Sequence, residues 1–417
     1  MKPSVMLHVV ASMDPERGGV GKAVRLIIAG LEKHGIVSEI LTLDPPVNDF
    51  CSNESFQVFA VGPQRTQWQY AKKLVPWLTS NFQNYDGVIL HGLWLYNSYA
   101  LRKVFDSMKR RARSTRSEWK RVPKLFVMPH GMLDPYFQKA TGRRLKALRN
   151  WIYWKLIERK TVNHADGLLF TCEQEKYLAR KSFRPYFPKL EIIVGLGVDE
   201  PPANANRMQL AFLQRLERPV KGPYILFLGR VNEKKGIDLL IEAYANFCSA
   251  LSSDQTLEER RNPNHPEIPS LIIAGPESES SFGRNLKKRV LESAILKDRV
   301  LFTGMLSGDA KWGAFYGSEA FILPSHQENF GIAVVEAMAC SKPVLISDQV
   351  NIWREIQESG AGLIESDTRE GVLKMLHKWY ALSEGERRSI QLNARKSFEK
   401  YFSGDLFAKK IAEIVYR

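Results

Sequence analysis

Short apolar runs alternate with longer amphipathic segments along this chain of 417 residues. The apolar runs lack regularly spaced polar positions, which is typical of parallel strands that are buried on both faces of a sheet. Because helix-like segments separate these runs, the alternation predicts doubly wound parallel sheets in an α/β protein. In the first half of the chain the runs are 5–12, 38–43, 56–62, 86–92, 124–131, 166–171 and 190–195.

The alternation stops over residues 199–223, where the composition is typical of a linker, and then begins again. We therefore expect two Rossmann-like domains, 1–200 and 201–395, with 396–417 as a C-terminal helix that packs back on the first domain. Ligands of doubly wound sheets bind beyond the carboxyl ends of the strands, so two such domains facing across a cleft would bind a ligand there. The strands expected in the second series are 224–229, 270–275, 299–304, 320–325 and 342–347.

The glycine-rich stretch ERGGVG, residues 16–21, follows the first apolar run and precedes a helix-like segment. It is not a Walker A loop, because Glu16 stands at the first glycine position and Ala23 follows the lysine. It is not a dinucleotide fingerprint either, because Val24 stands at the third glycine position. Two interpretations stay open: an anion site at the start of a helix, or a plain strand-to-helix turn.

Two basic residues, Arg230 and Lys235 in GRVNEKKG, follow the expected strand 224–229. A guanidinium and an ammonium beyond a strand end suit a diphosphate, whose charge grows as it departs as a leaving group. The alternative is a basic surface loop.

Two glutamates lie in the stretch 324–347, which contains ENFGIAVVEAMAC after an expected strand. Glu328 precedes a helix that opens near Phe330–Gly331, where free N–H groups can bind a phosphate. Glu336 lies inside the apolar helix and needs a partner, either ribose hydroxyls or a nearby arginine. Glu328 either contacts the hydroxyls of a bound sugar or lies on the surface.

Nearly all of the net charge of +15 comes from residues 101–160, which hold 18 Lys and Arg against 4 Asp and Glu. The segment interleaves basic and apolar residues, so it can lie on an anionic membrane, with Trp151, Tyr153 and Trp154 at the interface. It could also bind nucleic acid or form a solvated face. Since no nucleic-acid motif accompanies it, we favour the membrane and expect no nucleic acid.

No apolar run is long enough to span a bilayer, and the first run has the flanks of a strand instead of a signal peptide. The four cysteines are scattered without a C-x-x-C pair, which favours reduced thiols over a metal cluster. We therefore expect a cytoplasmic protein, either free or peripheral on the inner face of the plasma membrane.

Together these motifs resemble the retaining glycosyltransferases of the GT-B fold, glycosyltransferase family 4 of the bacterial polysaccharide type in particular. Glu328 and Glu336 match the family's pair of glutamates separated by seven residues, and GRVNEKKG resembles its diphosphate clamp. Gly19 best matches the glycine that approaches the donor, and His130 in MPHG matches a histidine that faces the donor sugar.

The resemblance implies a catalytic set and a donor-binding set of residues. The catalytic set is His130, Glu328, Arg230 and Lys235. The donor-binding set is Gly19, Arg230, Lys235, Met305 (from FTGML, the loop that meets the base), Glu328, Asn329, Phe330, Gly331, Ile332 and Glu336. His91, which also ends an expected strand, is either a further cleft residue or a structural histidine.

The resemblance also implies transfer of a hexose from a nucleotide-sugar to a glycan or lipid-linked acceptor, with retention through front-face attack. UDP-glucose is the first expectation for the donor and GDP-mannose the second. No Asp-x-Asp motif occurs, so neither a metal nor another cofactor is expected. The competing classes are a Rossmann oxidoreductase, which the glycine pattern disfavours, and a non-catalytic membrane or nucleic-acid adaptor, which would leave the glutamate pair unexplained.

Overall fold

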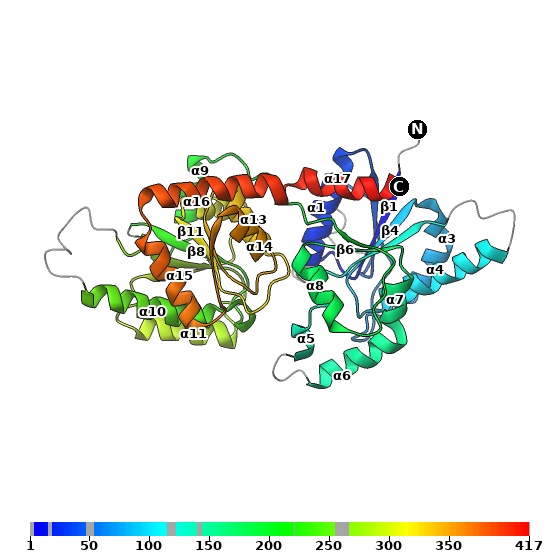
Figure 1. Ribbon diagram of the computed structural model, residues 1–417, viewed down its shortest axis with the longest axis horizontal. Coiled ribbons are helices and arrows are strands. Elements are labelled where there is room, and N and C mark those ends of the chain that lie inside the picture. The colour runs from blue at the N-terminus through cyan, green and yellow to red at the C-terminus, as the bar shows by residue number, and fades with distance from the viewer. Residues whose placement is uncertain are drawn as a thin grey trace. The chain divides into compact units, whose positions relative to one another are not determined.

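The chain folds into two compact units, seen in a computed structural model (Figure 1). One unit comprises Met1–Asp199 and Ser403–Arg417, and the other comprises Glu200–Phe402. We call them the N-terminal unit and the C-terminal unit. The residues that the structure describes are 4–15, 19–46, 54–114, 122–139, 144–220, 222–254 and 267–416.

The N-terminal unit is built on a parallel sheet of seven strands in its described part, in the order β3-β2-β1-β4-β5-β6-β7. The strands are almost entirely apolar because helices cover both faces of the sheet (Figure 1). Since the order reverses between β1 and β4, the carboxyl ends of these two strands mark the switch point where doubly wound folds bind ligands. The strands are β1 (Val5–Val10), β2 (Val37–Thr42), β3 (Val58–Ala60), β4 (Gly87–His91), β5 (Lys124–Met128), β6 (Gly167–Phe170) and β7 (Glu191–Ile193).

Helices follow most strands of this unit. A π-helical turn, Trp154–Glu158, joins α6 to α7 in one continuous helical run. The helices are α1 (Gly19–Lys33), α3 (Leu74–Asn81), α4 (Tyr96–Ser114), α5 (Tyr136–Lys139), α6 (Arg144–Tyr153), α7 (Arg159–His164), α8 (Glu173–Ser182) and α17 (Gly404–Tyr416).

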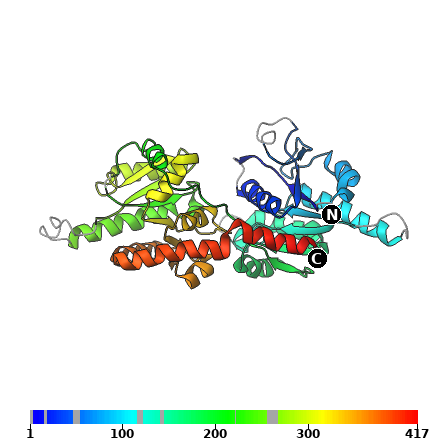
Figure 2. The ribbon, with the colours of Figure 1, turned by 90° about the horizontal axis from the view of Figure 1, so that it is seen from above.

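The last helix, α17, packs against α1 of the N-terminal unit. The two helices approach so closely that a side chain at Gly30 would contact Ala408 at 3.0 Å. An isolated parallel β-bridge between Val198 and Ser403 adds a further contact. It joins the two segments of the chain that make up the N-terminal unit, 1–199 and 403–417. Figure 1 shows α17 in red beside the blue helix α1, and Figure 2 shows the same pair from above.

The C-terminal unit has a parallel sheet of six strands in its described part, in the order β10-β9-β8-β11-β12-β13. Its switch point lies between β8 and β11. The strands are β8 (Tyr224–Leu228), β9 (Ser270–Ala274), β10 (Val300–Gly304), β11 (Ala320–Leu323), β12 (Val344–Ser347) and β13 (Gly362–Glu365).

The helices of the C-terminal unit again connect successive strands. The longest, α10, packs against α15. They are α9 (Asn206–Leu213), α10 (Ile237–Asp254), α11 (Ser281–Glu292), α12 (Gly308–Gly317), α13 (Ile332–Ala339), α14 (Trp353–Ser359), α15 (Arg369–Ala381) and α16 (Glu384–Ser397), with a 3-10 turn at Glu233–Lys235 and a π turn at Phe398–Phe402.

The twelve strands expected from the sequence all form, and the two sheets are those of a GT-B fold. Two details differ. The edge strand β13 was not predicted, because its run GLIE is short and only half-buried. The stretch expected to be a linker holds α9, since Met208 and Phe212 lie one helical turn apart and both are buried.

Candidate active site

Three charged residues expected at the donor site, two for the diphosphate and one for the sugar, follow the strands at the β8/β11 switch point of the C-terminal unit. Arg230 and Lys235 follow β8, and Glu328 follows β11. The ammonium of Lys235 forms an ion pair with the carboxylate of Glu328. Because β8 and β11 are neighbours in a parallel sheet, residues 93 positions apart meet at one edge.

Backbone contacts hold the loop after β8 against the end of β11. The amide of His326 donates to the carbonyl of Lys234 at 2.9 Å. Gly236, with φ of 64°, closes the 3-10 turn that carries Lys235, and a side chain there would lie 2.1 Å from the carbonyl oxygen of Pro324. The turn therefore requires glycine, and the close approach fixes Lys235 relative to Glu328.

Glu328 is an ionised carboxylate in a largely buried place. Burial would raise its pKa, but the charge and hydrogen bond of Lys235 outweigh burial and lower the pKa below its ordinary value. The backbone of Glu328 is also fixed, since its amide donates to Gln349 and its carbonyl accepts from Asn351 at 2.9 Å. The pair therefore presents fixed opposite charges at the strand ends.

Arg230 is held less tightly than Lys235. Its guanidinium Nη1 lies 3.6 Å from Oε1 of Glu277, and its side chain is more than half exposed. Glu277 belongs to the loop after β9, which approaches the loop after β8 so closely that a side chain at Gly275 would lie 1.8 Å from the Gly229 carbonyl. The guanidinium of Arg230 is thus accessible to a ligand, and its contact with Glu277 is long.

Glu336, in the middle of α13, is buried and paired with a lysine. Nζ of Lys311, from α12, lies 2.7 Å from Oε2 of Glu336. The sequence predicted ribose hydroxyls or an arginine as its partner, whereas the structure shows a lysine. Any hydroxyl bound by Glu336 would share the carboxylate with this ammonium.

The start of α13 brings together the other donor residues expected after β11. Gly331 caps the helix with φ of 78°, and a Cβ there would lie 3.5 Å from Cγ of Glu328. The amide of Ile332 has no acceptor among the residues that the structure describes, as expected in a first helical turn. Asn329 contacts the Asn351 amide at 3.4 Å, whereas the ring of Phe330 is buried against Phe402, so only its backbone can face a ligand.

Met305 lies just beyond β10, in the loop expected to meet the base. Its side chain is exposed, and its carbonyl accepts from Arg215 at 3.3 Å. A base that used this carbonyl would therefore compete with Arg215.

Two expected site residues, Gly19 and His130, belong to the N-terminal unit. Gly19 is the first residue of α1, and no atom lies within 4 Å of the position that a Cβ would take. The preceding residues of ERGGVG, 16–18, lie outside the described ranges. Lys22 lies on the exposed face of α1, as expected for a helix-surface residue.

His130 lies two residues beyond β5, in the left-handed region with φ of 52°. A buried carboxylate, Glu175, holds the next residue in place, since the amide of Gly131 donates to its Oε1 at 2.6 Å. The other oxygen of Glu175 accepts from the amide of Thr171 at 2.7 Å, at the end of β6. Backbone geometry and this carboxylate thus fix the place of His130.

The His130 ring is also fixed by His91, the last residue of β4. Nδ1 of His91 lies 2.9 Å from Nε2 of His130, and the two rings are stacked. Burial lowers the pKa of His130 to about 4, so the ring is neutral near pH 7. His91 was expected to be either a structural histidine or a further cleft residue. Its ring is buried, as a structural histidine would be, and it contacts His130, an expected site residue.

Family models match both units. Residues 18–193 match the glycosyl transferase 4-like domain, and residues 209–397 match the glycosyl transferases group 1 domain. The chain carries the two domains of a GT-B glycosyltransferase.

One similar protein is D-inositol 3-phosphate glycosyltransferase from Jonesia denitrificans, 24% identical over 254 residues, which are 58% of this chain and 55% of the relative. The chain thus spans about half the length of the curated relatives that it matches. Among solved structures, sucrose-phosphate synthase from Thermosynechococcus elongatus has a TM-score of 0.70 and 18% identity, covering 99% of this chain and 98% of that one. HepE of Anabaena, in complex with UDP and glucose, has a TM-score of 0.71 and 17% identity, covering 99% of both chains. These structural likenesses establish the fold.

The basic segment 101–160 differs from expectation in which of its aromatic residues are exposed. Residues 115–121 and 140–143 lie outside the described ranges. Trp154 is wholly buried and stacks on Phe183, so the expectation that it lies at a membrane interface was wrong: its ring belongs to the core of the unit. Tyr153 is half-buried and accepts a hydrogen bond from the indole of Trp68, whereas Trp151 is exposed.

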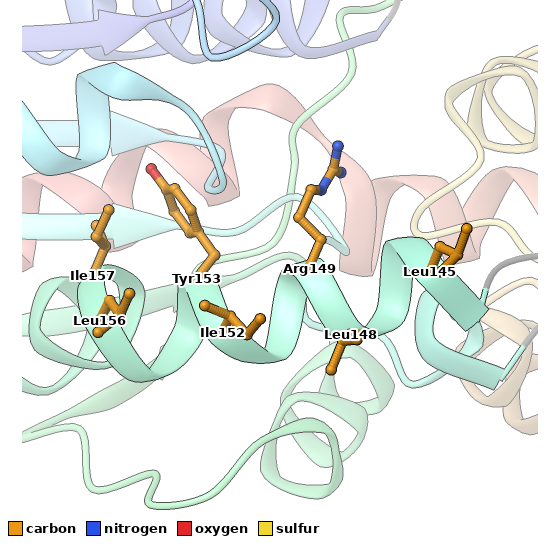
Figure 3. Close-up of a pocket in the computed structure, with 7 residues that line it drawn as sticks. All are labelled: Leu145, Leu148, Arg149, Ile152, Tyr153, Leu156 and Ile157. Carbon is orange, nitrogen blue, oxygen red and sulfur yellow. The ribbon is translucent and has the colours of Figure 1, made fainter.

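The same helical run exposes aliphatic side chains instead. Leu145, Leu148, Ile152 and Leu156 follow one another at helical spacing, and all are exposed (Figure 3). They line a shallow pocket of about 340 Å³ with Arg149 and the half-buried Tyr153. We call these four residues the apolar stripe. Exposed apolar side chains that follow one another along a helix in this way form a candidate interaction surface.

Sequence reasoning missed four charged or titratable residues near the expected sites. Two of them, Glu277 and Lys311, are ordinary surface-type residues whose role depends on strands far apart in sequence. The other two left a signal: His8 interrupts the apolar run VMLHVV, and Glu175 follows a strand within a helix start. Among the described residues, no helix is both long and apolar enough to cross a membrane.

Proposed function

We propose that this protein is a retaining glycosyltransferase that moves a hexose from a nucleotide-sugar to a glycan or lipid-linked acceptor in polysaccharide biosynthesis. The observation that carries the proposal is the Lys235–Glu328 ion pair beside Arg230 at the β8/β11 switch point. Fixed cations at a strand end suit a diphosphate, and a fixed carboxylate suits sugar hydroxyls.

UDP-glucose is the proposed donor, and GDP-mannose is the alternative. The likeness to HepE, which was solved with UDP and glucose, supports the former at the level of the fold. The matched domains support a sugar-transfer reaction, because both are glycosyltransferase domains.

In the proposed mechanism the acceptor hydroxyl attacks the anomeric carbon from the side of the leaving group. The departing diphosphate oxygen takes the proton of the acceptor, while Arg230, Lys235 and the free amide of Ile332 stabilise its growing charge. Glu328 holds sugar hydroxyls, and its ion pair with Lys235 keeps it ionised. Because two protein cations neutralise the diphosphate, the scheme requires no metal.

Calorimetry with UDP and GDP tests the donor site. Arg230→Ala and Glu336→Ala should each weaken binding by about 2 kcal/mol or more, since each loses a charge-assisted contact. Arg289→Ala is the matched control for Arg230, because Arg289 is similarly exposed and paired with Glu242 in the same unit. Unchanged affinity for both nucleotides in both site variants would refute the assignment.

A panel of nucleotide-sugars then identifies the donor. Hydrolysis without acceptor should be fastest with UDP-glucose, and faster turnover of GDP-mannose would favour the alternative. A nucleoside diphosphate should raise the Tm, whereas NAD should not, which separates a transferase from an oxidoreductase.

We further propose that the apolar stripe attaches the protein to an anionic membrane. Lys146, Arg149, Lys155 and Lys160 surround the stripe, and all are exposed. Aliphatic side chains can insert below the headgroups while the basic residues contact anionic lipids, each contributing roughly 1 kcal/mol at moderate salt. A membrane-bound enzyme would meet a lipid-linked acceptor at that surface.

Co-sedimentation with vesicles across a salt series tests this attachment. Anionic vesicles should bind the protein at low salt and release it at high salt, and neutral vesicles should bind it less. Leu156→Glu should weaken attachment, whereas Leu291→Glu should not, because Leu291 is similarly exposed but belongs to α11 of the C-terminal unit and not to the apolar stripe. Protein that stays in the supernatant at low salt would contradict the proposal.

A further inference from the structure

Three histidines form a hydrogen-bonded column at the switch point of the N-terminal unit. Nδ1 of His8 lies 2.9 Å from Nε2 of His91, and Nδ1 of His91 lies 2.9 Å from Nε2 of His130. Both pairs of rings are stacked with centroids 5.2 Å apart. We call these residues the histidine column.

Strand register brings the three rings together. His8 of β1 pairs with Ile89 of β4, so His91, two residues further on, points to the same face of the sheet. His91 in turn pairs with Met128 at the end of β5, and His130 follows two residues later. The column therefore runs from the buried interior of the sheet to its carboxyl edge.

All three rings are neutral near pH 7. Burial lowers the pKa of His8 to about 3 and that of His130 to about 4, and it lowers the pKa of His91 well below its ordinary value. The rings would also repel one another if charged.

A column of three neutral imidazoles has only two proton arrangements. Each ring carries one N–H, and each of the two hydrogen bonds needs one donor and one acceptor. Either every ring is protonated on Nδ1, or every ring is protonated on Nε2.

The inner end of the column decides between them. Nε2 of His8 is buried and has no partner among the residues that the structure describes. Protonation on Nε2 would bury an N–H without an acceptor, whereas protonation on Nδ1 leaves only an unused lone pair. Orphaned buried N–H groups are the rarer case in native proteins, so protonation on Nδ1 is favoured.

The outer end of the column then becomes a hydrogen-bond donor. His130 is half-buried, and its Nδ1 has no partner among the described residues. We propose that His8 and His91 are positioning residues that hold His130 as the Nδ1–H tautomer, so that Nδ1–H donates to an oxygen of the bound sugar. This inference rests on the proposed function of His130 at the donor sugar.

Nitrogen-15 NMR of the whole protein, labelled in its histidines, tests the tautomer directly. In the unaltered protein His130 should show a protonated Nδ1 and a bare Nε2. In His91→Phe the ring of His130 loses its hydrogen-bond partner at Nε2, and the fraction of His130 in the Nε2–H tautomer should rise. His34→Phe is the control, because His34 is exposed in the same unit and should leave the His130 signals unchanged.

Steady-state kinetics tests the role of the tautomer. His91→Phe should lower kcat roughly tenfold or more with little change in the KM for the nucleotide-sugar. The reason is that the His130 ring is no longer held in the tautomer that donates a hydrogen bond to the sugar. His91→Gln, whose amide can again donate to Nε2 of His130, should recover part of the loss. The Gln variant also keeps the test valid if His91→Phe fails to fold.

The outcomes separate this inference from the proposed function. A His130 that is protonated on Nε2 in the unaltered protein, or a tautomer that His91→Phe leaves unchanged, would overturn the column. If His130→Ala loses activity, but His91→Phe shifts the tautomer of His130 and stays fully active, the tautomer does not matter for turnover. That result would overturn the positioning role of His91. Full activity of His130→Ala would instead refute the proposed role of His130 at the sugar, and the inference with it.

Discussion

The two units handle buried ionisable groups at their switch points in opposite ways. At β1/β4 of the N-terminal unit the histidine column stays neutral, and Glu158 nearby is also moved toward its neutral form, because burial raises its pKa to about 7. At β8/β11 of the C-terminal unit, Lys235 and Glu328 stay charged as a pair, and the pKa of Glu328 is lowered. One topology thus supports two electrostatic environments.

The difference has a physical origin in the available partners. A buried charge is tolerated only when an opposite charge compensates for the lost hydration, and Lys235 does so for Glu328. Among the residues that the structure describes, His91 forms hydrogen bonds only with two other imidazoles, so its neutral form is favoured. This comparison suggests that the C-terminal unit binds charge and the N-terminal unit donates neutral hydrogen bonds.

Lys235→Met should have the largest effect, because it removes the charged pair of the C-terminal unit and leaves Glu328 buried without its counter-charge. Removing one partner of such a pair costs about 3–5 kcal/mol, part of which the carboxyl can recover by protonation. We expect nucleotide affinity to fall at least 100-fold in calorimetry, as the ammonium contact is also lost. Lys374→Met is the control, since Lys374 pairs with Glu365 on the exposed surface of the same unit. Equal affinities in the two variants would contradict the ionic character of the site.

His130→Ala, in the N-terminal unit, should lower turnover without weakening donor binding, unlike a change in the charged pair of the C-terminal unit. We expect kcat to fall by roughly 10²-fold while donor affinity changes little, since the ring would contact the sugar where charge develops. Measured kcat and donor Kd give the two effects separately. A loss of affinity with unchanged kcat would indicate simple ground-state binding instead.

His8→Leu should change how stability depends on pH. The folded pKa of His8, about 3, lies below the value of about 6.5 expected when unfolded, so below pH 6.5 the unfolded chain binds a proton that the folded chain does not. This histidine therefore lowers stability by about 1.4 kcal/mol for each pH unit as the pH falls from 6.5 toward 3. Urea denaturation at pH 7 and pH 5 should show a smaller pH-dependent loss in His8→Leu than in the unaltered protein, and parallel losses would show that His8 already titrates when folded.

Glu277→Gln should have the smallest effect of these changes. The Arg230–Glu277 contact is long and exposed, so its loss should alter the free energy of unfolding by about 0.5 kcal/mol or less. Nucleotide affinity should stay equal or rise slightly, because Arg230 no longer has to leave a carboxylate. A marked fall in affinity would show that Glu277 itself contributes to the site.

The sequence by itself determined the parallel strands and where they end. Largely apolar runs such as 5–12 and 224–229 can be buried only between layers of helices, and polar residues directly after them must lie at the carboxyl edge of a sheet. For this reason Arg230, Lys235 and Glu328 could be named before any contact was known, whereas His130 was named from the family resemblance. The short edge strand β13 was missed because its pattern is too brief to distinguish from a loop.

Only the tertiary structure decided which charged and titratable groups meet. Lys235 and Glu328 lie 93 residues apart, and His8 and His91 lie 83 residues apart. Their contacts depend on strand order and register, which local patterns do not encode. Burial likewise decided that Trp154 belongs to the core and Leu156 to the surface, although both lie in one basic amphipathic segment. A π turn shifts the helical phase there, so the side chains that face solvent are fixed only by packing against the rest of the unit.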